Sequence, residues 1–225
     1  MYSAKDYRKQ AWGTLRGHWG VMAISQLIYL LITLVCGALS YYVIGAIVLI
    51  LVSGPIELGI YKMSLYLLRG EKVEIPTLFS GFKDMSRAII LWLTNYILIG
   101  LWALLLIIPG IIKKYSYSMS YFVLLDNPNM TANEARKRSM ELMKGNKWRL
   151  FCLHLSYIGW ILLSVITFGI LYLWVLPSIR TAEAAFYKSL LPEEEKSETF
   201  DGGFEDVIDV DVEPFESSKN DDITF

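Results

Sequence analysis

Long apolar stretches separated by short charged segments dominate the chain. The first stretch, residues 21–68, contains only two charged side chains, Glu57 and Lys62. At 1.5 Å per residue it would form about 70 Å of helix, which is enough to cross a bilayer core of roughly 30 Å twice. The segment CGALSYY, at 36–42, is the predicted turn between the two crossings.

The second and third apolar stretches have a similar form. Residues 88–108 are uncharged and long enough to span once, and the shorter segment 111–125 follows them. Because 111–125 is short for a full crossing, it predicts either a returning span or a re-entrant element. Residues 150–191 are apolar again, with a turn predicted near 167–169.

These patterns predict an all-α fold, a polytopic transmembrane helical bundle of about six spans arranged as three helical hairpins with amphipathic interfacial helices. Each unit begins with a glycine-containing interfacial segment (LRGHW, FSGFK and MKGNKW), followed by an apolar span. The returning spans carry predicted helix breaks at Pro55, Pro109 and Pro177. A weak threefold repeat would explain this likeness, and so would chance similarity among short apolar segments.

Charge divides the chain into two domains. Residues 192–225 carry 13 acidic and 2 basic side chains, whereas residues 1–191 carry 19 basic and 9 acidic ones. The basic residues flank apolar segments, so the positive-inside rule places both termini and the basic loops in the cytoplasm. This distribution also favours anionic membrane lipids over nucleic acid as partners. We expect a transmembrane helical domain over 1–191 and a disordered, acidic cytoplasmic tail over 192–225.

A basic amphipathic helix is predicted between the second and third hairpins. Thr131 and Glu134 form a T-x-x-E capping box, and Gly145 stands where such a helix would end. We expect this helix to lie on the inner membrane surface. Its basic residues are the candidate ligands for anionic lipid: Arg136, Lys137, Arg138, Lys144, Lys147 and Arg149.

Six charged residues inside predicted spans are a candidate intramembrane ligand cluster. Four of them are Glu57, Lys62, Arg180 and Glu183. Ionisable side chains in a span are costly unless they are paired or hydrated. In one interpretation, Glu57 and Arg180 meet inside the bundle. In the other, Arg180 pairs with Glu183 on its own helix, while Glu57 pairs with Lys62 or with water.

Two lysines complete this cluster. Lys113 and Lys114 follow Pro109-Gly110 in the most apolar part of the chain. If Pro109-Gly110 is the outer turn of the middle hairpin, both lysines are close enough to snorkel to the outer headgroups. In the alternative interpretation, one of them faces a water-filled cavity and binds an anion.

No motif indicates catalysis. The chain lacks H-E-x-x-H, G-x-S-x-G, P-loop and dinucleotide-binding patterns, so we expect no enzymatic activity, no catalytic residue and no cofactor. Cys36 and Cys152 lie far apart in apolar runs, which predicts neither a metal site nor a disulfide. We interpret His154 in the fifth predicted span as an interhelical hydrogen-bonding residue, with proton relay as the alternative.

Five segments, LFSGFKD, LLLIIPGII, YSMSYFVLLDNP, SMELMKGNKWRLF and LSYIGWILL, together resemble the domain-of-unknown-function 975 family. The resemblance covers roughly residues 1–191. It implies a multi-spanning helical protein of the bacterial cytoplasmic membrane. It implies no activity and supplies no catalytic residues.

The sequence therefore supports two functions from different classes. The first is a non-enzymatic integral membrane protein that binds lipid or a protein partner, for which the VIDVDV segment and the C-terminal ITF of the tail are candidate ligands. The alternative is a small transporter or lipid-translocating protein whose cavity is lined by intramembrane charges. A dry, fully paired bundle would favour the first function, and hydrated intramembrane charges would favour the second.

Overall fold

The computed structural model describes residues 3–39, 43–167 and 169–200, and the regular elements in these ranges are all helical, which confirms the all-α prediction. The elements are α1 (Ala4–Thr14), α2 (Trp19–Leu39), α3 (Val43–Leu68), α4 (Ile75–Leu78), the 3-10 helix η1 (Phe79–Asp84), α5 (Met85–Leu105), α6 (Ile107–Tyr117), α7 (Ser120–Asp126), α8 (Ala132–Leu142), α9 (Lys147–Ser156), α10 (Ile158–Ile166), α11 (Tyr172–Leu190) and α12 (Glu193–Phe200).

Four segments of the described chain are long and apolar enough to cross a membrane: Trp19–Ala38, Ile47–Leu68, Ile75–Leu105 and Lys147–Ile166. They contain α2, most of α3, α5 with the two short helices before it, and α9 with α10. These segments indicate a multi-pass membrane protein. The other two predicted spans differ in kind, because the segment after Leu106 is divided between α6 and α7 and α11 carries three charged residues.

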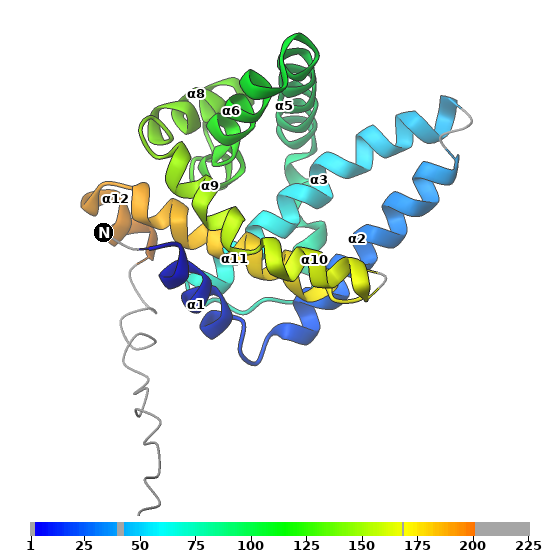
Figure 1. Cartoon of the computed structure of the whole chain (residues 1–225). Coiled ribbons are helices and arrows are strands. Elements are labelled where there is room, and N and C mark those ends of the chain that lie inside the picture. Colours follow the sequence, from blue (N-terminus) through cyan, green and yellow to red (C-terminus); the bar gives the residue numbers. More distant parts are fainter. Residues whose placement is uncertain (1–2, 40–42, 168, 201–225) are drawn as a thin grey trace, which may run out of the picture.

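Three helical hairpins, α2–α3, α5–α6 and α10–α11, extend in different directions from a common centre (Figure 1). The N-terminus and α12 lie on the side of the molecule opposite the tip of the α2–α3 hairpin. The predicted turns lie between these helices, since α2 ends at Leu39 and α3 begins at Val43, while α10 ends at Ile166 and α11 begins at Tyr172.

The structure corrects the predicted helix breaks. Pro55 lies inside α3 and Pro177 lies inside α11, and both helices continue through these residues. The middle hairpin turns at Leu106, whose backbone is extended (φ −158°, ψ 134°), so Pro109 lies in the first turn of α6. Proline is tolerated there because the first N–H groups of a helix have no intrahelical acceptor. The condition that Pro109-Gly110 forms the outer turn of the middle hairpin is therefore not met.

Two glycines allow helices to pack closely around the centre. A Cβ atom added at Gly110 would lie 2.8 Å from the Cα atom of Ala103, so α6 approaches the backbone of α5 as only a glycine permits. A Cβ atom added at Gly59 would lie 1.9 Å from the carbonyl oxygen of Leu78. The second contact holds the end of α4 against the turn of α3 that also carries Glu57.

Helix α11 is the central helix of the fold. It has eleven buried residues between Val175 and Tyr187 and contacts α1, α2, α3, α9 and α10. At its middle, the hydroxyl groups of Tyr157 and Ser178 lie 3.0 Å apart, and near its end the hydroxyl of Tyr7 donates to Ser189 Oγ over 2.8 Å. Because α11 is surrounded by other helices, its charged residue Glu183 is buried and Arg180 is half-buried.

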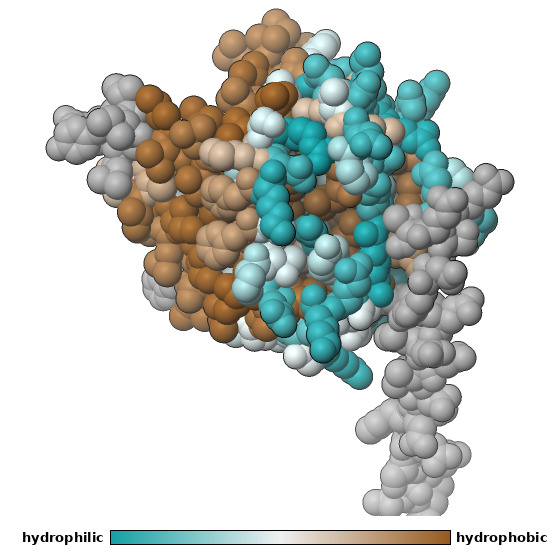
Figure 2. All heavy atoms as spheres, turned by 180° about the vertical axis from the view of Figure 1, so that it is seen from behind, coloured by the Kyte–Doolittle hydropathy of each residue, from teal (hydrophilic) through white to brown (hydrophobic). Residues whose placement is uncertain are grey.

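The surface has an apolar half and a polar half. Figure 2 shows hydrophobic residues gathered on the side of the α2–α3 tip and hydrophilic residues on the opposite side. Large apolar side chains near the three tips are exposed, among them Leu34, Leu104 and Val165. Such a surface is unfavourable in water and matches the hydrocarbon core of a bilayer.

The acidic tail is described only as far as Phe200. Residues 193–200 form α12, so the prediction of disorder is wrong for this part of the tail. The VIDVDV segment and the C-terminus lie outside the described residues, and their predicted disorder and partner binding stay predictions.

Candidate ligand-binding cavity

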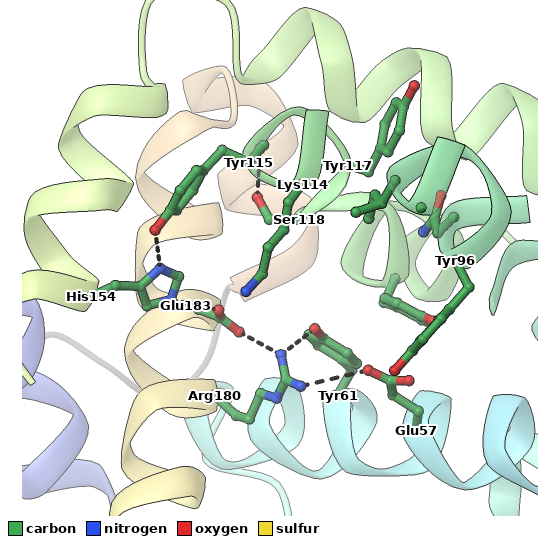
Figure 3. A pocket seen from close by; sticks show the side chains of 14 residues that line it. Glu57, Tyr61, Tyr96, Lys114, Tyr115, Tyr117, Ser118, His154, Arg180 and Glu183 are labelled. Atoms are coloured by element: carbon green, nitrogen blue, oxygen red, sulfur yellow. Dashed lines mark hydrogen bonds and ion pairs between the residues drawn. The ribbon is translucent and has the colours of Figure 1, made fainter. Parts of the chain in front are cut away.

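A cavity of about 460 Å³ lies where the three hairpins meet. Figure 3 shows its walls, which are formed by side chains of α3, α5, α6, α7, α9 and α11 together with Ser118. Four charged residues line it: Glu57, Lys114, Arg180 and Glu183. Five tyrosines also line it: Tyr61, Tyr96, Tyr115, Tyr117 and Tyr121.

Ionisable side chains from four helices, α3, α11, α9 and α6, form a continuous chain of contacts along the cavity. Arg180 Nη2 lies 3.5 Å from Glu57 Oε1, and Arg180 Nη1 lies 3.1 Å from Glu183 Oε2. Glu183 Oε1 lies 2.9 Å from His154 Nε2, and His154 Nδ1 lies 3.3 Å from the hydroxyl of Tyr115. The structure thus contains both the cross-helix pair and the local pair that the sequence offered as alternatives. Two carboxylates around one guanidinium offset much of the cost of removing these charges from water.

Tyr61 fixes the position of Arg180 against α3. Arg180 Nη1 donates to the hydroxyl oxygen of Tyr61, and the guanidinium carbon lies 4.5 Å from the centre of the same ring. The ring of Tyr61 stacks on Tyr121 of α7, with 4.5 Å between centroids and an interplanar angle of 6°. Glu57 and Tyr61 are four residues apart, so one face of α3 supplies both contacts to Arg180.

The three lysines of the predicted cluster occupy different surroundings. Lys114 lines the cavity, and its ammonium group points into it (Figure 3). Lys113 Nζ lies 5.0 Å from the ring of Trp102, and Lys62 Nζ lies 5.2 Å from the ring of Tyr66, and neither residue lines the cavity. Across residues 3–39, 43–167 and 169–200, the Lys114 ammonium has no ion pair, hydrogen bond or aromatic contact.

The side-chain oxygen of Asn95 is a second polar group, besides the Lys114 ammonium, that has no partner among the described residues. Its Nδ2 donates to Ser120 Oγ over 3.0 Å, while its Oδ1 is buried and, within the described part of the chain, accepts no hydrogen bond. The residue lines the cavity and is only 6% exposed. A buried acceptor of this kind is costly unless a water molecule or a ligand donates to it.

The predicted basic helix is two helices, α8 and α9, joined through Gly145, which has a positive φ of 83°. The Thr131–Glu134 capping box is present at the start of α8. The six basic residues serve different contacts. Lys137 and Lys144 are exposed, and Lys147 is half-buried. Arg136 lies over Tyr117, Arg138 pairs with Glu141 and Glu195, and Arg149 donates to Asn146 and Tyr7.

Four of the six intramembrane cluster residues therefore reach the cavity, and Lys62 and Lys113 do not. Sequence reasoning missed Asn95 and most of the tyrosines as lining residues and treated His154 separately. The i, i+4 spacing of Glu57 with Tyr61 and of Tyr117 with Tyr121 was the available signal. In the residues that the structure describes, no cluster of three or more His, Cys, Asp or Glu side chains is placed to hold a metal ion.

Comparison with known proteins gives one result. Residues 103–194 match the family model described as Protein of unknown function (DUF975), which confirms the resemblance over that range. The matched range contains Lys114, His154, Arg180 and Glu183 of the cavity, whereas Glu57 and Asn95 precede it. No curated protein and no solved structure matches the chain.

Proposed function

We propose that this chain, whose residues 103–194 match the model of the DUF975 family of unknown function, is a non-enzymatic membrane protein that binds the phosphate-containing headgroup of an anionic lipid in its central cavity. The observation that carries the proposal is the Lys114 ammonium, which points into the cavity and forms no ion pair with any of the described residues. The guanidinium of Arg180 already has two carboxylates. A phosphate group would therefore pair with Lys114.

The other open group of the cavity specifies the ligand further. Asn95 Oδ1 is a buried acceptor, and a hydroxyl group on the ligand could donate a hydrogen bond to it. The five tyrosine rings provide the amphipathic walls on which a polyol or an acyl chain packs. Hydroxyl-bearing phosphate esters combine these features.

The surroundings of the cavity favour a ligand that enters from the bilayer. Tyr96 and Gly100 line the cavity from α5, and on the same helix Ile97 and Leu101 are exposed apolar residues. A headgroup that occupies the cavity would leave its acyl chains next to such residues. Hydrocarbon chains are favourable there because these residues are as apolar as lipid tails.

The orientation that accompanies this function has both termini in the cytoplasm of a bacterium, with the four long apolar segments embedded in its cytoplasmic membrane. The exposed side chains of Lys137 and Lys144 support it, since cationic residues next to apolar segments are retained on the cytoplasmic side. The test is a Lys144→Cys variant of a protein that lacks Cys36 and Cys152. A membrane-impermeant maleimide should label it only from the cytoplasmic side, and labelling from outside would reverse the orientation.

A second candidate function is translocation of the same lipid. The Arg180–Glu57 contact joins the first and third hairpins, so movement of one hairpin relative to the other would break this contact and change the shape of the cavity. Transport requires such alternation around a site. Lipid flipping in proteoliposomes that depends on Lys114 would support translocation, whereas binding without flipping supports the first function alone.

The binding test compares two adjacent lysines. Purified wild type, Lys114→Gln and Lys113→Gln proteins are titrated with phosphatidylglycerol and, separately, phosphatidylcholine, and bound lipid is counted by native mass spectrometry. We expect Lys114→Gln to weaken phosphatidylglycerol binding about 10-fold to 100-fold, the range of one lost hydrogen bond to a charged group, and Lys113→Gln to leave it unchanged.

Two results would decide against this proposal. Equal effects of the two substitutions would mean that Lys114 is not the site, and equal affinity for both lipids would mean that its charge does not select the ligand. Glycerol 3-phosphate, added as a competitor, separates the two sources of phosphate. If this soluble compound competed with the lipid, the ligand of Lys114 would be a water-soluble phosphate ester and not a lipid.

A further inference from the structure

Helix α12 holds one aromatic side chain in a cationic setting. Phe200, the last residue of α12, is buried at 8% exposure and belongs to the main core cluster. The guanidinium carbon of Arg69 lies 4.9 Å from the centre of its ring, and Lys188 Nζ lies 4.8 Å from it. Two cations over one aromatic ring form favourable cation–π contacts that a purely apolar pocket lacks.

One acidic residue of α12, Glu195, faces a third cation. Glu195 Oε1 lies 3.1 Å from Arg138 Nη2 of α8, which also pairs with Glu141 at 3.6 Å. Arg69 follows α3, Arg138 belongs to α8 and Lys188 belongs to α11. Three separate parts of the membrane domain thus converge on the eight residues of α12.

Phe200 joins α12 to the core cluster, and the contacts around it resemble those of a peptide bound to a receptor. The occupant is short and acidic, and its last residue is an aromatic anchor in a pocket. An isolated helix of eight residues is unstable in water, so α12 depends on these contacts for its structure. Charge complementarity specifies the occupant, because the site presents cations and the sequence of α12, EEEKSETF, is acidic.

We propose that Arg69, Arg138 and Lys188 form a docking site for an acidic peptide segment with an aromatic anchor, and that α12 occupies this site as its intramolecular ligand. Release of α12 leaves the site open to a segment of the same chemistry from another protein. This site is separate from the cavity, and it does not depend on the lipid-binding proposal.

The docking site is connected to the cavity by one short helix. Arg69 Nη2 lies 2.5 Å from Asp126 Oδ1, and Tyr187 donates to Asp126 Oδ2 over 3.0 Å. Asp126 ends α7, and Tyr121 of the same helix lines the cavity. Because Phe200 covers the Arg69 side chain that holds Asp126, occupancy of the docking site affects the position of α7.

The test uses the full-length protein and a fluorescent peptide of residues 192–201. In wild type, α12 competes at the high effective concentration of a tethered ligand, so the peptide should bind weakly. Phe200→Ala removes the anchor of α12 and should raise the affinity for the peptide at least about 10-fold. Phe204→Ala is the matched control, since Phe204 is also followed by an acidic residue, and it should behave as wild type.

Further arms establish which groups bind. Adding Arg138→Gln to Phe200→Ala should reduce peptide affinity about 5-fold to 10-fold, because Arg138 is the partner of Glu195. A peptide in which Phe200 is replaced by Ala should bind at least about 10-fold more weakly than the native peptide. Fluorescence anisotropy measures each affinity, at low and at high salt.

Three outcomes would overturn the proposal. Equal binding by wild type and Phe200→Ala would mean that α12 does not occupy the site to which the peptide binds. If the native peptide and the peptide with Ala at position 200 bound equally well, Phe200 would not be the anchor. If Phe200→Ala failed to bind the peptide but gained affinity for phosphatidylglycerol, the three cations would be a lipid site and not a peptide site.

Discussion

Arg180 of α11 lies 3.5 Å from Glu57 of α3, and this contact joins the first hairpin of the chain to the third. The same guanidinium pairs with Glu183 at 3.1 Å and donates to the hydroxyl of Tyr61. Arg180 is therefore the common partner of two carboxylates and a phenol. Loss of the cation should cost more than loss of either anion.

We expect Arg180→Gln to lower the free energy of unfolding by about 3–5 kcal/mol, because it leaves the buried carboxylate of Glu183 and the half-buried carboxylate of Glu57 without their cation. Glu57→Gln should cost less, roughly 1–3 kcal/mol, since Arg180 keeps Glu183. Combining the two substitutions should be less harmful than the sum of their separate effects. Thermal unfolding of the four proteins in one detergent measures this, and strict additivity would show that the pair is not coupled.

Gly110 and Gly100 lie in the same hairpin but have different surroundings. Gly110→Ala places a methyl group 2.8 Å from the Cα atom of Ala103, and we expect it to destabilise the protein by about 1–3 kcal/mol. No heavy atom lies within 4 Å of a Cβ atom at position 100, so Gly100→Ala should be neutral or stabilising by up to about 1 kcal/mol. Chemical unfolding distinguishes the two, and equal effects would contradict close packing at Gly110.

Arg149 and Lys144 were both predicted to bind lipid, yet their contacts differ. Arg149 donates to Asn146 and to the hydroxyl of Tyr7, whereas the side chain of Lys144 is exposed. Arg149→Gln should therefore destabilise the protein by about 1–3 kcal/mol. Lys144→Gln should change the free energy of unfolding by less than about 0.5 kcal/mol. If thermal unfolding showed that Lys144→Gln destabilises the protein more than Arg149→Gln, the hydrogen bonds of Arg149 would not stabilise the fold.

The capping box of α8 predicts that the stability of the folded protein depends on pH. A hydrogen bond from the backbone N–H of Thr131, followed by one from its hydroxyl, lowers the pKa of Glu134 below its ordinary value of 4.5. The folded state therefore favours the carboxylate. Its stabilising contribution is complete above the unfolded pKa and is lost as the pH falls through the lower, folded pKa.

Glu134→Gln tests this pH dependence because glutamine retains the capping geometry but does not titrate. Between about pH 6 and about pH 3, the melting temperature of the variant should fall less than that of wild type. Glu141→Gln on the same helix is the control for removing one surface carboxylate. If the melting temperature fell as much in Glu134→Gln as in wild type, the carboxylate of Glu134 would not be responsible for the pH dependence.

The local features of the fold could be predicted from the sequence because they depend on neighbouring residues. Hydropathy located α2, α3 and α5, and the T-x-x-E spacing located the start of α8. The proline rule was less successful. Pro55 and Pro177 lie inside continuous helices, because the surrounding packing supports a helix despite the missing N–H group, and the turn at Leu106 has no proline or glycine of its own.

The sequence by itself determined that this protein is an all-α membrane protein with ionisable residues in its apolar segments, since hydrophobicity is a property of each stretch of chain. It also identified Glu57, Lys114, Arg180 and Glu183 as candidates. Only the tertiary structure decided that these four meet and that Lys113 turns toward Trp102. Adjacent residues of a helix point about 100° apart, so the rotation of α6 against its neighbours places one lysine in the cavity and the other outside it.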